Sequence, residues 1–372
     1  MKQHEVVIVG GGLAGLTAAI HLAQKGQKIT LFEKDAFPRH KVCGEYLSLE
    51  VKPYFDALKI PFDDLEPARI TKLHYSTPSG RTVQVKLPLG AFGVSRYALD
   101  HLLYKTALDN GVKVIQEKVL KMTFSGSEFV VSTAQGDHSA AYVLGSFGKR
   151  SLLDKKLDRK FFREPAPWVA VKNHYLEQDF PNDLVGLHNF DGGYCGLSRT
   201  ETGEINLCYL ATYRSFKDHK SPERFNENVL RKNPFLDRFL SRATPVFEQP
   251  LSIAQISYEK KEAVKDHVLM LGDAAGLIHP LCGNGMAIAI HSAKIASEEL
   301  LTHLERKTSR QEMEAAYKKR WERSFSRRFN AAGWLQKILL QPQLAEISQG
   351  LISRMPFVLP QIIKQTHGSP II

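Results

Sequence analysis

The chain has 372 residues, of which 43% are hydrophobic and 24% charged, so it can bury a large core and is expected to form about two domains. Its formal net charge of +11 suits an anionic cofactor, an acidic partner, an anionic membrane surface or a solvated basic surface. The sequence contains no zinc finger, RNP-like strand or basic tail, which excludes a nucleic-acid-binding module, and no run of about 18 apolar residues, which excludes a membrane-spanning helix.

The four cysteines are too scattered for a disulfide framework, and no closely spaced pair indicates a metal site. The first predicted strand begins so near Met1 that no room is left for a signal peptide. We therefore expect a cytoplasmic protein without a metal cofactor.

The N-terminal residues have the pattern of a β-α-β unit. Residues 6–9 form an apolar run rich in β-branched side chains, which predicts a buried parallel strand, and helical apolar spacing follows over residues 13–24. A second apolar run over residues 28–32 predicts the next strand. A Gly-x-Gly-x-x-Gly motif lies between the first strand and the helix.

Each glycine of this motif has its own expected role. Gly10 permits the tight turn, Gly12 lets the backbone approach a pyrophosphate, and Gly15 lets the helix and the strand pack closely. The phosphates would lie at the helix N-terminus, where N–H groups are unpaired. Glu33, roughly 20 residues further on, is placed to accept hydrogen bonds from a ribose hydroxyl. The segment therefore predicts a dinucleotide-binding site.

A loop is predicted over residues 37–48, which contain Pro and Gly. Cys43 in this loop lies beside two cations that can stabilise a thiolate, and a buried, inert thiol is the alternative. The pattern then predicts a hairpin of strands 72–77 and 81–87, a helix capped by Ser95 that runs to about residue 110, a strand at 112–116, a hairpin of strands 119–124 and 128–133, and a strand at 142–145.

Residues 161–261 predict a mostly β region, with strands at 168–175, 184–190, 194–198, 205–211 and 251–258 and a helix that begins after Ser221. In the first of these strands Val169 and Val171 share one face, whereas Lys172 and His174 share the other. We expect this region to form an antiparallel sheet that is inserted into the nucleotide-binding domain and suits substrate binding.

A second glycine-rich segment begins after the apolar residues 268–271. This predicted strand ends in Gly272 and Asp273, at the edge where open α/β sheets bind ligands. A turn that contains Pro280 then leads into a helix predicted from Met286 to about residue 301, whose N-terminus offers free N–H groups.

The last predicted helix carries aromatic side chains at every fourth position, at Tyr317, Trp321, Phe325 and Phe329. Basic residues lie between them, namely Lys318, Lys319, Arg320, Arg323, Arg327 and Arg328. This pattern is typical either of an interfacial helix in peripheral contact with a membrane or of a helix that packs on the protein and has a solvated basic face.

Together these motifs resemble the FAD-dependent oxidoreductases with a glutathione-reductase-type nucleotide site and the aromatic-hydroxylase architecture, and within them most closely the geranylgeranyl-reductase group. The segments that carry the resemblance are Gly10–Gly15 with Glu33, Arg39–Ser48, Arg96–Asp100 and Gly272–Met286. The resemblance implies an α/β fold and FAD as the cofactor.

The expected architecture has three parts: a Rossmann-like FAD-binding domain (1–48, 93–160 and 262–305), an interleaved antiparallel β-sheet substrate domain (49–92 and 161–261) and a C-terminal helical region (306–372).

The resemblance also assigns residues to the adenosine and phosphate half of FAD. It implies that Ala14 contacts the pyrophosphate and Glu33 the adenosine ribose, and that Leu120 meets the adenine through its backbone. Arg96 would neutralise phosphate or brace the flavin, and Asp273 would bind the ribityl chain or the pyrophosphate.

At the flavin ring, the resemblance implies that Gly285 and Met286 point N–H groups at the N1–C2=O edge, where reduction places negative charge. The loop that contains Val42, Cys43 and Glu45 would pass close to the ring. This makes Cys43 the candidate catalytic residue.

The sequence also departs from the group. The Tyr-x-Trp-x-Phe-Pro motif of geranylgeranyl reductases is absent, and Gly193–Ser198 stands roughly in its place. The substrate-pocket candidates are Tyr194 and Cys195 from this segment and Pro280 and Cys282 from the second glycine-rich segment. The Trp-x-Trp-x-Ile-Pro motif of flavin-dependent halogenases is also absent, which disfavours halogenation. No second Gly-x-Gly-x-x-Gly motif exists for a resident nicotinamide, so NAD(P)H would dock transiently or another protein would supply electrons.

These observations favour a reductase that transfers hydride from reduced flavin to a lipophilic, unsaturated substrate of isoprenoid or polyketide type. Cys43 would be the proton donor or polarising group. An aromatic monooxygenase that uses NAD(P)H and O₂ and a flavoprotein electron carrier are the alternatives, because one fold can support several chemistries.

Overall fold

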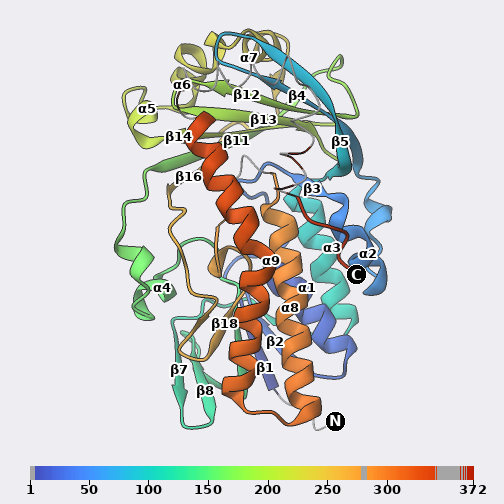
Figure 1. Ribbon diagram of the computed structural model, residues 1–372, viewed down its shortest axis with the longest axis vertical. Coiled ribbons are helices and arrows are strands. Elements are labelled where there is room, and N and C mark those ends of the chain that lie inside the picture. The colour runs from blue at the N-terminus through green and yellow to red at the C-terminus, as the bar shows by residue number, and fades with distance from the viewer. Residues whose placement is uncertain are drawn as a thin grey trace.

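The computed structural model describes residues 5–277 and 283–339 and, near the C-terminus, residues 341, 361, 363, 365 and 367–372. Within these residues the strands form a six-stranded, a nine-stranded and a three-stranded sheet. Figure 1 shows an elongated molecule with the nine-stranded sheet at its upper end and the six-stranded sheet below it. The predicted α/β class, with a Rossmann-like part and a separate β-sheet part, is confirmed.

The six-stranded sheet has the order β17-β18-β10-β1-β2-β6, and all its pairs are parallel except β17 with β18. Its strands are β1 (Glu5–Val9), β2 (Lys28–Phe32), β6 (Lys113–Ile115), β10 (Tyr142–Gly145), β17 (Val264–Lys265) and β18 (Val268–Met270). Because helices cover such a sheet, its central strand is a continuous apolar run, and Val6, Val7 and Ile8 are fully buried.

The helices of this part are α1 (Leu13–Gln24), α3 (Arg96–Asp109) and α8 (Gly285–Arg306). Helix α1 packs between the other two, and ten of its twelve residues are buried. Ser95 caps α3 as expected, since its hydroxyl accepts the N–H of Ala98 at 3.0 Å. The α3 helix therefore begins at Arg96, the residue that the resemblance places near the cofactor.

The nine-stranded sheet consists of β3 (Tyr46–Ser48), β4 (Ala68–Ser76), β5 (Thr82–Gly93), β11 (Trp168–Leu176), β12 (Leu184–Phe190), β13 (Gly193–Arg199), β14 (Ile205–Thr212), β15 (Thr244–Pro245) and β16 (Leu251–Ile256). It is not wholly antiparallel as expected, because β12 pairs with β4 in parallel. The β4–β5 hairpin and the β11–β14 meander come from separate segments of the chain, and no tight turn forces their junction to be antiparallel.

The two faces of this sheet have different neighbours. On the outer face Val169, Val171 and Tyr209 pack against Phe225 and Leu230, which come from the short helices above the sheet in Figure 1. These helices are α5 (Tyr213–Lys217), α6 (Pro222–Asn228), the 3₁₀ helix η4 (Leu230–Lys232) and α7 (Pro234–Leu240).

The opposite face, here called the inner face, looks toward the six-stranded part and carries Lys172 and His174, as the alternation predicts. Both side chains are buried, because the sheet is covered on both faces.

The remaining elements are the three-stranded sheet β7 (Lys121–Ser125), β8 (Glu128–Ser132) and β9 (Asp137–Ala140), the helices α2 (Lys52–Ala57) and α4 (Leu152–Lys156), and the 3₁₀ helices η1 (Leu49–Val51), η2 (Phe62–Leu65), η3 (Lys160–Arg163) and η5 (Gly272–Ala274). Strand β9 extends the hairpin expected from the sequence. The domain boundaries stay a prediction, although β3 lies within the range 1–48 and pairs with β5.

Helix α9 (Arg310–Leu339) runs beside α8 along the long axis (Figure 1). Its aromatic residues face the protein interior: Tyr317 and Phe325 are fully buried, and the Tyr317 hydroxyl donates to the carbonyl of Met270 at 2.5 Å. The structure therefore agrees with the alternative in which this helix packs on the protein. The aromatic side chains that an interfacial helix would place in a membrane are buried inside the protein instead. Among the described helices, none combines the length and apolarity needed to cross a bilayer.

Candidate functional site

The first glycine turn has the geometry that its sequence predicts. Gly10 has φ +109°, and a Cβ there would lie 2.4 Å from the carbonyl oxygen of Ser146. A Cβ on Gly15 would lie 2.0 Å from the carbonyl oxygen of Gly10, so helix and strand pack at a distance that only glycine allows. A Cβ on Gly12 would meet only the Arg96 guanidinium, at 3.9 Å. Gly12 thus borders an open space, and the Arg96 guanidinium lies on the opposite side of that space.

Glu33 is buried beside this turn. Its Oε2 accepts the N–H of Gly11 at 2.7 Å, and its Oε1 accepts the N–H of Asp35 at 3.1 Å and a guanidinium N–H of Arg39 at 3.0 Å. The carboxylate therefore holds the glycine turn and the following loop together at the place where a ribose is expected.

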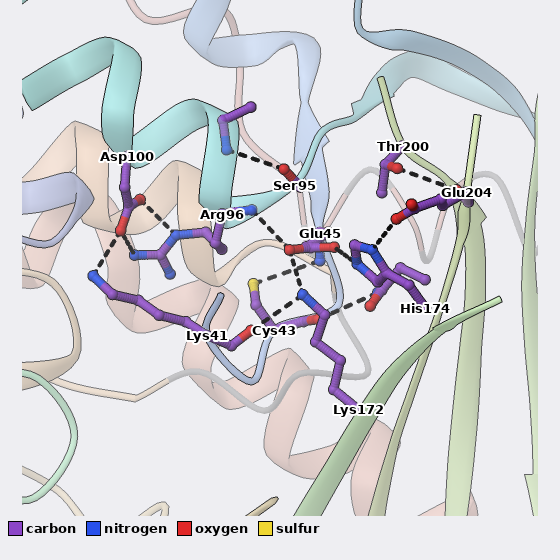
Figure 2. Close-up of polar contacts among 12 residues, drawn as sticks. Lys41, Cys43, Glu45, Ser95, Arg96, Asp100, Lys172, His174, Thr200 and Glu204 are labelled. Atoms are coloured by element: carbon purple, nitrogen blue, oxygen red, sulfur yellow. Dashed lines mark hydrogen bonds and ion pairs between the residues drawn. The ribbon is translucent and has the colours of Figure 1, made fainter. Parts of the chain in front are cut away.

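Arg96 is held in place by a buried ion triad (Figure 2). Its Nε and Nη2 donate to Asp100 at 2.7 and 2.8 Å, and Lys41 donates to the same carboxylate at 2.6 Å. Burial would raise the pKa of Asp100, but the charges of Arg96 and Lys41 outweigh it and lower the pKa. Arg96 is consequently a fixed cation toward Gly12, as suits a phosphate contact.

The second glycine motif meets the first one in space. Gly272 has φ +54°, and a Cβ there would lie 3.2 Å from the Cβ atoms of both Ala14 and Ala289. The η5 turn with half-buried Asp273 therefore lies between the first turn of α1 and helix α8.

Two buried cations support the η5 turn. Lys261 donates to the carbonyl of Asp273 at 2.7 Å, and Arg159 donates to that of Ala274 at 2.7 Å. Burial lowers the pKa of Lys261 to about 8, against the opposing effect of Asp154 and Asp273.

Helix α8 begins at Gly285, and its second residue, Met286, is buried. The side chain of Asn284, at the N-cap position, makes no capping hydrogen bond to the helix. Within the part of the chain that the structure describes, no side chain caps this helix start, which suits an electron-rich group, as the resemblance implies for the flavin. Pro280 and Cys282 lie outside the described residues.

The Cys43 loop, residues 33–45 between β2 and β3, crosses the inner face of the nine-stranded sheet. Cys43 is half-buried, its sulfur accepts the N–H of Glu45 at 3.5 Å, and its carbonyl accepts an N–H of Asn206 from β14 at 3.2 Å. Lys172 from β11 donates to the carbonyl of Lys41 at 3.3 Å. Two strands of the sheet therefore position the loop.

Glu45 is the fully buried centre of this contact (Figure 2). Its carboxylate accepts Lys172 Nζ at 2.5 Å and the N–H of Arg96 at 2.7 Å, and it faces His174 Nε2 at 2.7 Å. Burial would raise the pKa of Glu45, but the hydrogen bond from His174 and the charge of Lys172 together lower it. Glu45 thus joins the start of α3 to the sheet.

His174 extends this network toward the surface, because its Nδ1 lies 2.7 Å from the carboxylate of Glu204. His40, Glu45 and His174 bring their ligand atoms within 4.8 Å of one another, close enough for a metal ion. However, both ring nitrogens of His174 and both oxygens of Glu45 already have partners, and the Lys172 cation would repel a metal ion. We therefore treat the group as a hydrogen-bonded network.

The structure separates the two cysteines of the neighbouring strands β13 and β14. Cys195, a pocket candidate from the sequence, lies in the outer-face core and points away from the Cys43 loop. Cys208 instead pairs in register with Lys172 on β11 and so shares its inner face. Burial and the neighbouring Cys43 raise the pKa of Cys208 to about 12. The thiol beside Cys43 is therefore Cys208, and the assignment of Cys195 is corrected.

Tyr194 lies on the inner face, in an apolar patch. This inner apolar patch consists of Trp168, Ala170, Tyr194, Leu210, Ile256 and Leu277. Val42, from the Cys43 loop, packs against it. Two of the predicted residues, Val42 and Tyr194, are therefore brought together between the loop and the sheet.

Leu120 lies apart from these groups, just before β7. Its N–H donates to the carbonyl of Ser132 at 2.7 Å and its side chain is 40% exposed. Its expected backbone contact with adenine stays a prediction.

Lys172, His174 and Glu204 were not identified as functional from the sequence. A signal existed for the first two, because a lysine and a histidine share one face of a largely apolar strand. Nothing local distinguishes Glu204, which lies in the turn before β14 and whose partner His174 lies on β11.

The residues present fit FAD. A pyrophosphate, a ribityl chain and a flavin ring require the kinds of groups found here: the open side of Gly12, the fixed Arg96 cation, the η5 turn and the N-terminus of α8. When bound, FAD supplies hydride or electron transfer, while the protein residues orient it and control protons.

Comparisons with known proteins point to the same cofactor. A family model described as "FAD dependent oxidoreductase" matches residues 5–42. The menaquinone reductase of Mycobacterium tuberculosis is 27% identical over 80% of this chain and 76% of its own length. The tryptophan 2-halogenase of Chondromyces crocatus is 24% identical over 79% of this chain, but the match spans only 60% of that protein.

Among solved structures, the flavin-dependent brominase Bmp2 superposes with a TM-score of 0.80 at 19% identity, over 98% of this chain and 93% of its own. The fold is therefore that of flavin-dependent halogenases and related oxidoreductases. The finer assignment to the geranylgeranyl-reductase group is not confirmed by these relatives. The chain is a flavin-dependent enzyme of the oxidoreductase type, with FAD as its cofactor.

Proposed function

We propose that the chain is a reductase that acts on a lipophilic, unsaturated substrate of isoprenoid or polyketide type. The observation that carries this proposal is the inner apolar patch, which adjoins the Cys43 loop through Val42. An apolar environment beside a loop that carries a thiol suits a hydrocarbon-like substrate whose double bond needs one proton. The similarity to a menaquinone reductase supports the same substrate class, because menaquinone is lipophilic and unsaturated.

Reduction of a carbon–carbon double bond adds a hydride to one carbon and a proton to the other. Bound FAD, reduced beforehand by transiently docked NAD(P)H, would supply the hydride. Cys43 would donate the proton from its thiol and be left as a thiolate. The fixed cation of Arg96 lies beside it, and the Lys172 ammonium group contacts the same loop.

Halogenation is the second candidate, favoured by the similarity to the halogenase of Chondromyces crocatus and to the brominase fold. Against it stands the absent Trp-x-Trp-x-Ile-Pro motif, since the three tryptophans of the chain are Trp168, Trp321 and Trp334.

Anaerobic flavin chemistry distinguishes these candidates. The FAD-loaded protein is reduced with NADH or NADPH and then mixed either with menaquinone-4 or with O₂ and bromide. A reductase is reoxidised by menaquinone-4 and yields a product two mass units heavier that air does not reverse. Bromination of an aromatic acceptor with matching O₂ consumption would establish halogenation instead, and O₂-dependent hydroxylation would establish a monooxygenase.

The role of Cys43 has its own test. Cys43→Ser should keep FAD bound but lower turnover by about tenfold or more, because a hydroxyl is the poorer proton donor. Cys195→Ala is the matched control, since this thiol lies on the outer face and its loss should leave turnover unchanged. Equal turnover of the Cys43 variant and the wild type would remove Cys43 from the mechanism.

A further inference from the structure

Four charged side chains form an unbroken line of hydrogen bonds that leads from the protein surface to the Cys43 loop (Figure 2). The Glu204 carboxylate lies 2.7 Å from His174 Nδ1, His174 Nε2 lies 2.7 Å from Glu45 Oε2, and Glu45 Oε1 lies 2.5 Å from Lys172 Nζ. The side chain of Glu204 is 25% exposed, whereas that of Lys172 is fully buried. The line therefore has a solvent end and an interior end.

Each link of this line carries a transferable proton. Both ring nitrogens of His174 face carboxylate oxygens, and an ionised carboxylate can only accept hydrogen bonds. A ring that donates to both carboxylates is an imidazolium, with one N–H directed at each acceptor. On the interior side, Lys172 donates a proton of its ammonium group to Glu45. Acids and bases thus alternate along the line.

The interior end lies against the loop that carries the proposed proton donor, Cys43. Lys172 Nζ contacts the carbonyl of Lys41, two residues before Cys43, and Lys172 is paired in register with Cys208. Cys43, Lys172 and Glu45 all act on Cys208 electrostatically, so the four groups are neighbours. Glu45 and Lys172 alone would be sufficient to anchor the loop by an ion pair. His174 and Glu204 add a hydrogen-bonded connection from this pair to the solvent.

We propose that Glu204, His174, Glu45 and Lys172 form a proton relay that returns a solvent proton to Cys43 after each reduction, an inference that rests on the reductase function proposed above. The thiolate takes a proton from the Lys172 ammonium. The His174 imidazolium then gives a proton to Glu45. The Glu45 carboxyl group turns toward Lys172 and passes this proton to the Lys172 amine. His174 regains its proton from Glu204 and water. One proton enters for each double bond reduced, and the hydride comes from flavin reduced by NAD(P)H.

The first experiment examines the His174 ring directly. Nitrogen NMR of the FAD-loaded protein labelled with ¹⁵N-histidine should show both ring nitrogens protonated at neutral pH, with the signal assigned by its loss in His174→Gln. A neutral ring with one protonated nitrogen would overturn the relay, whatever the activity of the protein.

The second experiment measures transfer. Glu204→Gln retains a hydrogen-bond acceptor for His174 but cannot exchange a proton. Steady-state reduction of menaquinone-4 should slow by about tenfold or more, and its solvent deuterium isotope effect should rise, because proton return to Cys43 between turnovers becomes limiting. Flavin reduction by NAD(P)H and FAD binding should stay unchanged.

The matched control is Glu201→Gln in the same turn, where the carboxylate accepts the N–H of Ser95 at 2.6 Å rather than contacting His174. This variant should keep the wild-type isotope effect. Wild-type steady-state turnover and isotope effect in Glu204→Gln would refute the relay while the reductase function stood. A wild-type enzyme that never reduces menaquinone-4 would instead overturn the proposed function, and the relay with it.

Discussion

Glu33 shows how one buried side chain can serve both the fold and the cofactor. Its carboxylate holds Gly11 in the first glycine turn and binds Arg39 of the Cys43 loop, at the place where the ribose is expected. Removing it leaves the Gly11 N–H without its acceptor and leaves a loop less firmly fixed.

We expect Glu33→Ala to weaken FAD binding by about tenfold or more, since an unmet buried N–H costs about 1–3 kcal/mol. Flavin fluorescence titration of the apoprotein measures the change. Lys34→Ala, at the exposed neighbouring position, is the control and should bind FAD as the wild type does. An unchanged affinity in Glu33→Ala would contradict the role assigned to this carboxylate.

His188 on β12 is a second residue with a measurable consequence. It is buried against Phe235, its Nδ1 lies 2.8 Å from the Ser76 hydroxyl, and burial together with the nearby His74 lowers its pKa from 6.5 to about 3. The unfolded chain therefore takes up a proton on His188 below pH 6.5, whereas the folded protein does so only near pH 3. The unfolded state binds more protons in this window, so stability falls as the pH drops through it.

From pH 6.5 to 5 this single group should remove on the order of 2 kcal/mol of unfolding free energy. Urea unfolding at pH 7 and pH 5 should therefore show a smaller loss on acidification for His188→Gln than for the wild type, even if the variant is less stable at both values. Equal losses would mean that His188 is protonated in the folded protein.

At the scale of the element, α9 illustrates how a sequence pattern can fit two environments. Its aromatic row could meet a membrane or a protein core, and the structure packs Tyr317, Trp321 and Phe325 against α8 and the η5 region. The basic positions Lys319, Arg323 and Arg327 remain exposed on the opposite side. The helix is therefore part of the support of the cofactor site.

Phe325→Ala should lower the unfolding free energy by about 3–5 kcal/mol, because it opens a cavity in a fully buried position. Ser326→Ala at the adjacent exposed position should change it by less than about 0.5 kcal/mol. Chemical denaturation monitored by circular dichroism compares the two. A mild effect of Phe325→Ala would indicate that α9 contributes little to the packed core.

At the scale of the whole molecule, two interleaved parts are joined through buried charges. Glu45 follows the Cys43 loop and binds Lys172 of the sheet and the N–H of Arg96 at the start of α3. Glu201 makes a parallel connection, from the β13–β14 turn to Ser95. The position of the substrate sheet over the FAD site thus depends on the buried Glu45–Lys172 ion pair and on the half-buried Glu201–Ser95 hydrogen bond.

Lys172→Met should destabilise the protein by about 3–5 kcal/mol, because it leaves the Glu45 carboxylate buried with less compensating charge. The double variant Glu45→Gln/Lys172→Met should be more stable than the sum of the single variants implies, with a coupling of about 1–3 kcal/mol. Denaturation of all four proteins completes the cycle. Additive effects would show that the two side chains do not act as a pair.

The amino-acid sequence by itself determined the features whose causes are local. The turn at Gly10 follows from backbone freedom, the start of α3 from the Ser95 cap, and the alternation along β11 from the geometry of a strand. These features were sufficient to predict the α/β class and the position of the dinucleotide motif.

Only the tertiary structure decided which groups meet. Alternation says that neighbouring residues face opposite ways but not which face is inner, so Cys195 was expected on the substrate side of the sheet, whereas Cys208 lies on that inner face. The pairing of Glu45 with Lys172 joins residues 127 positions apart. No local sequence pattern encodes such a contact. A buried charge needs a partner, and the packing of distant segments decides which residue that partner is.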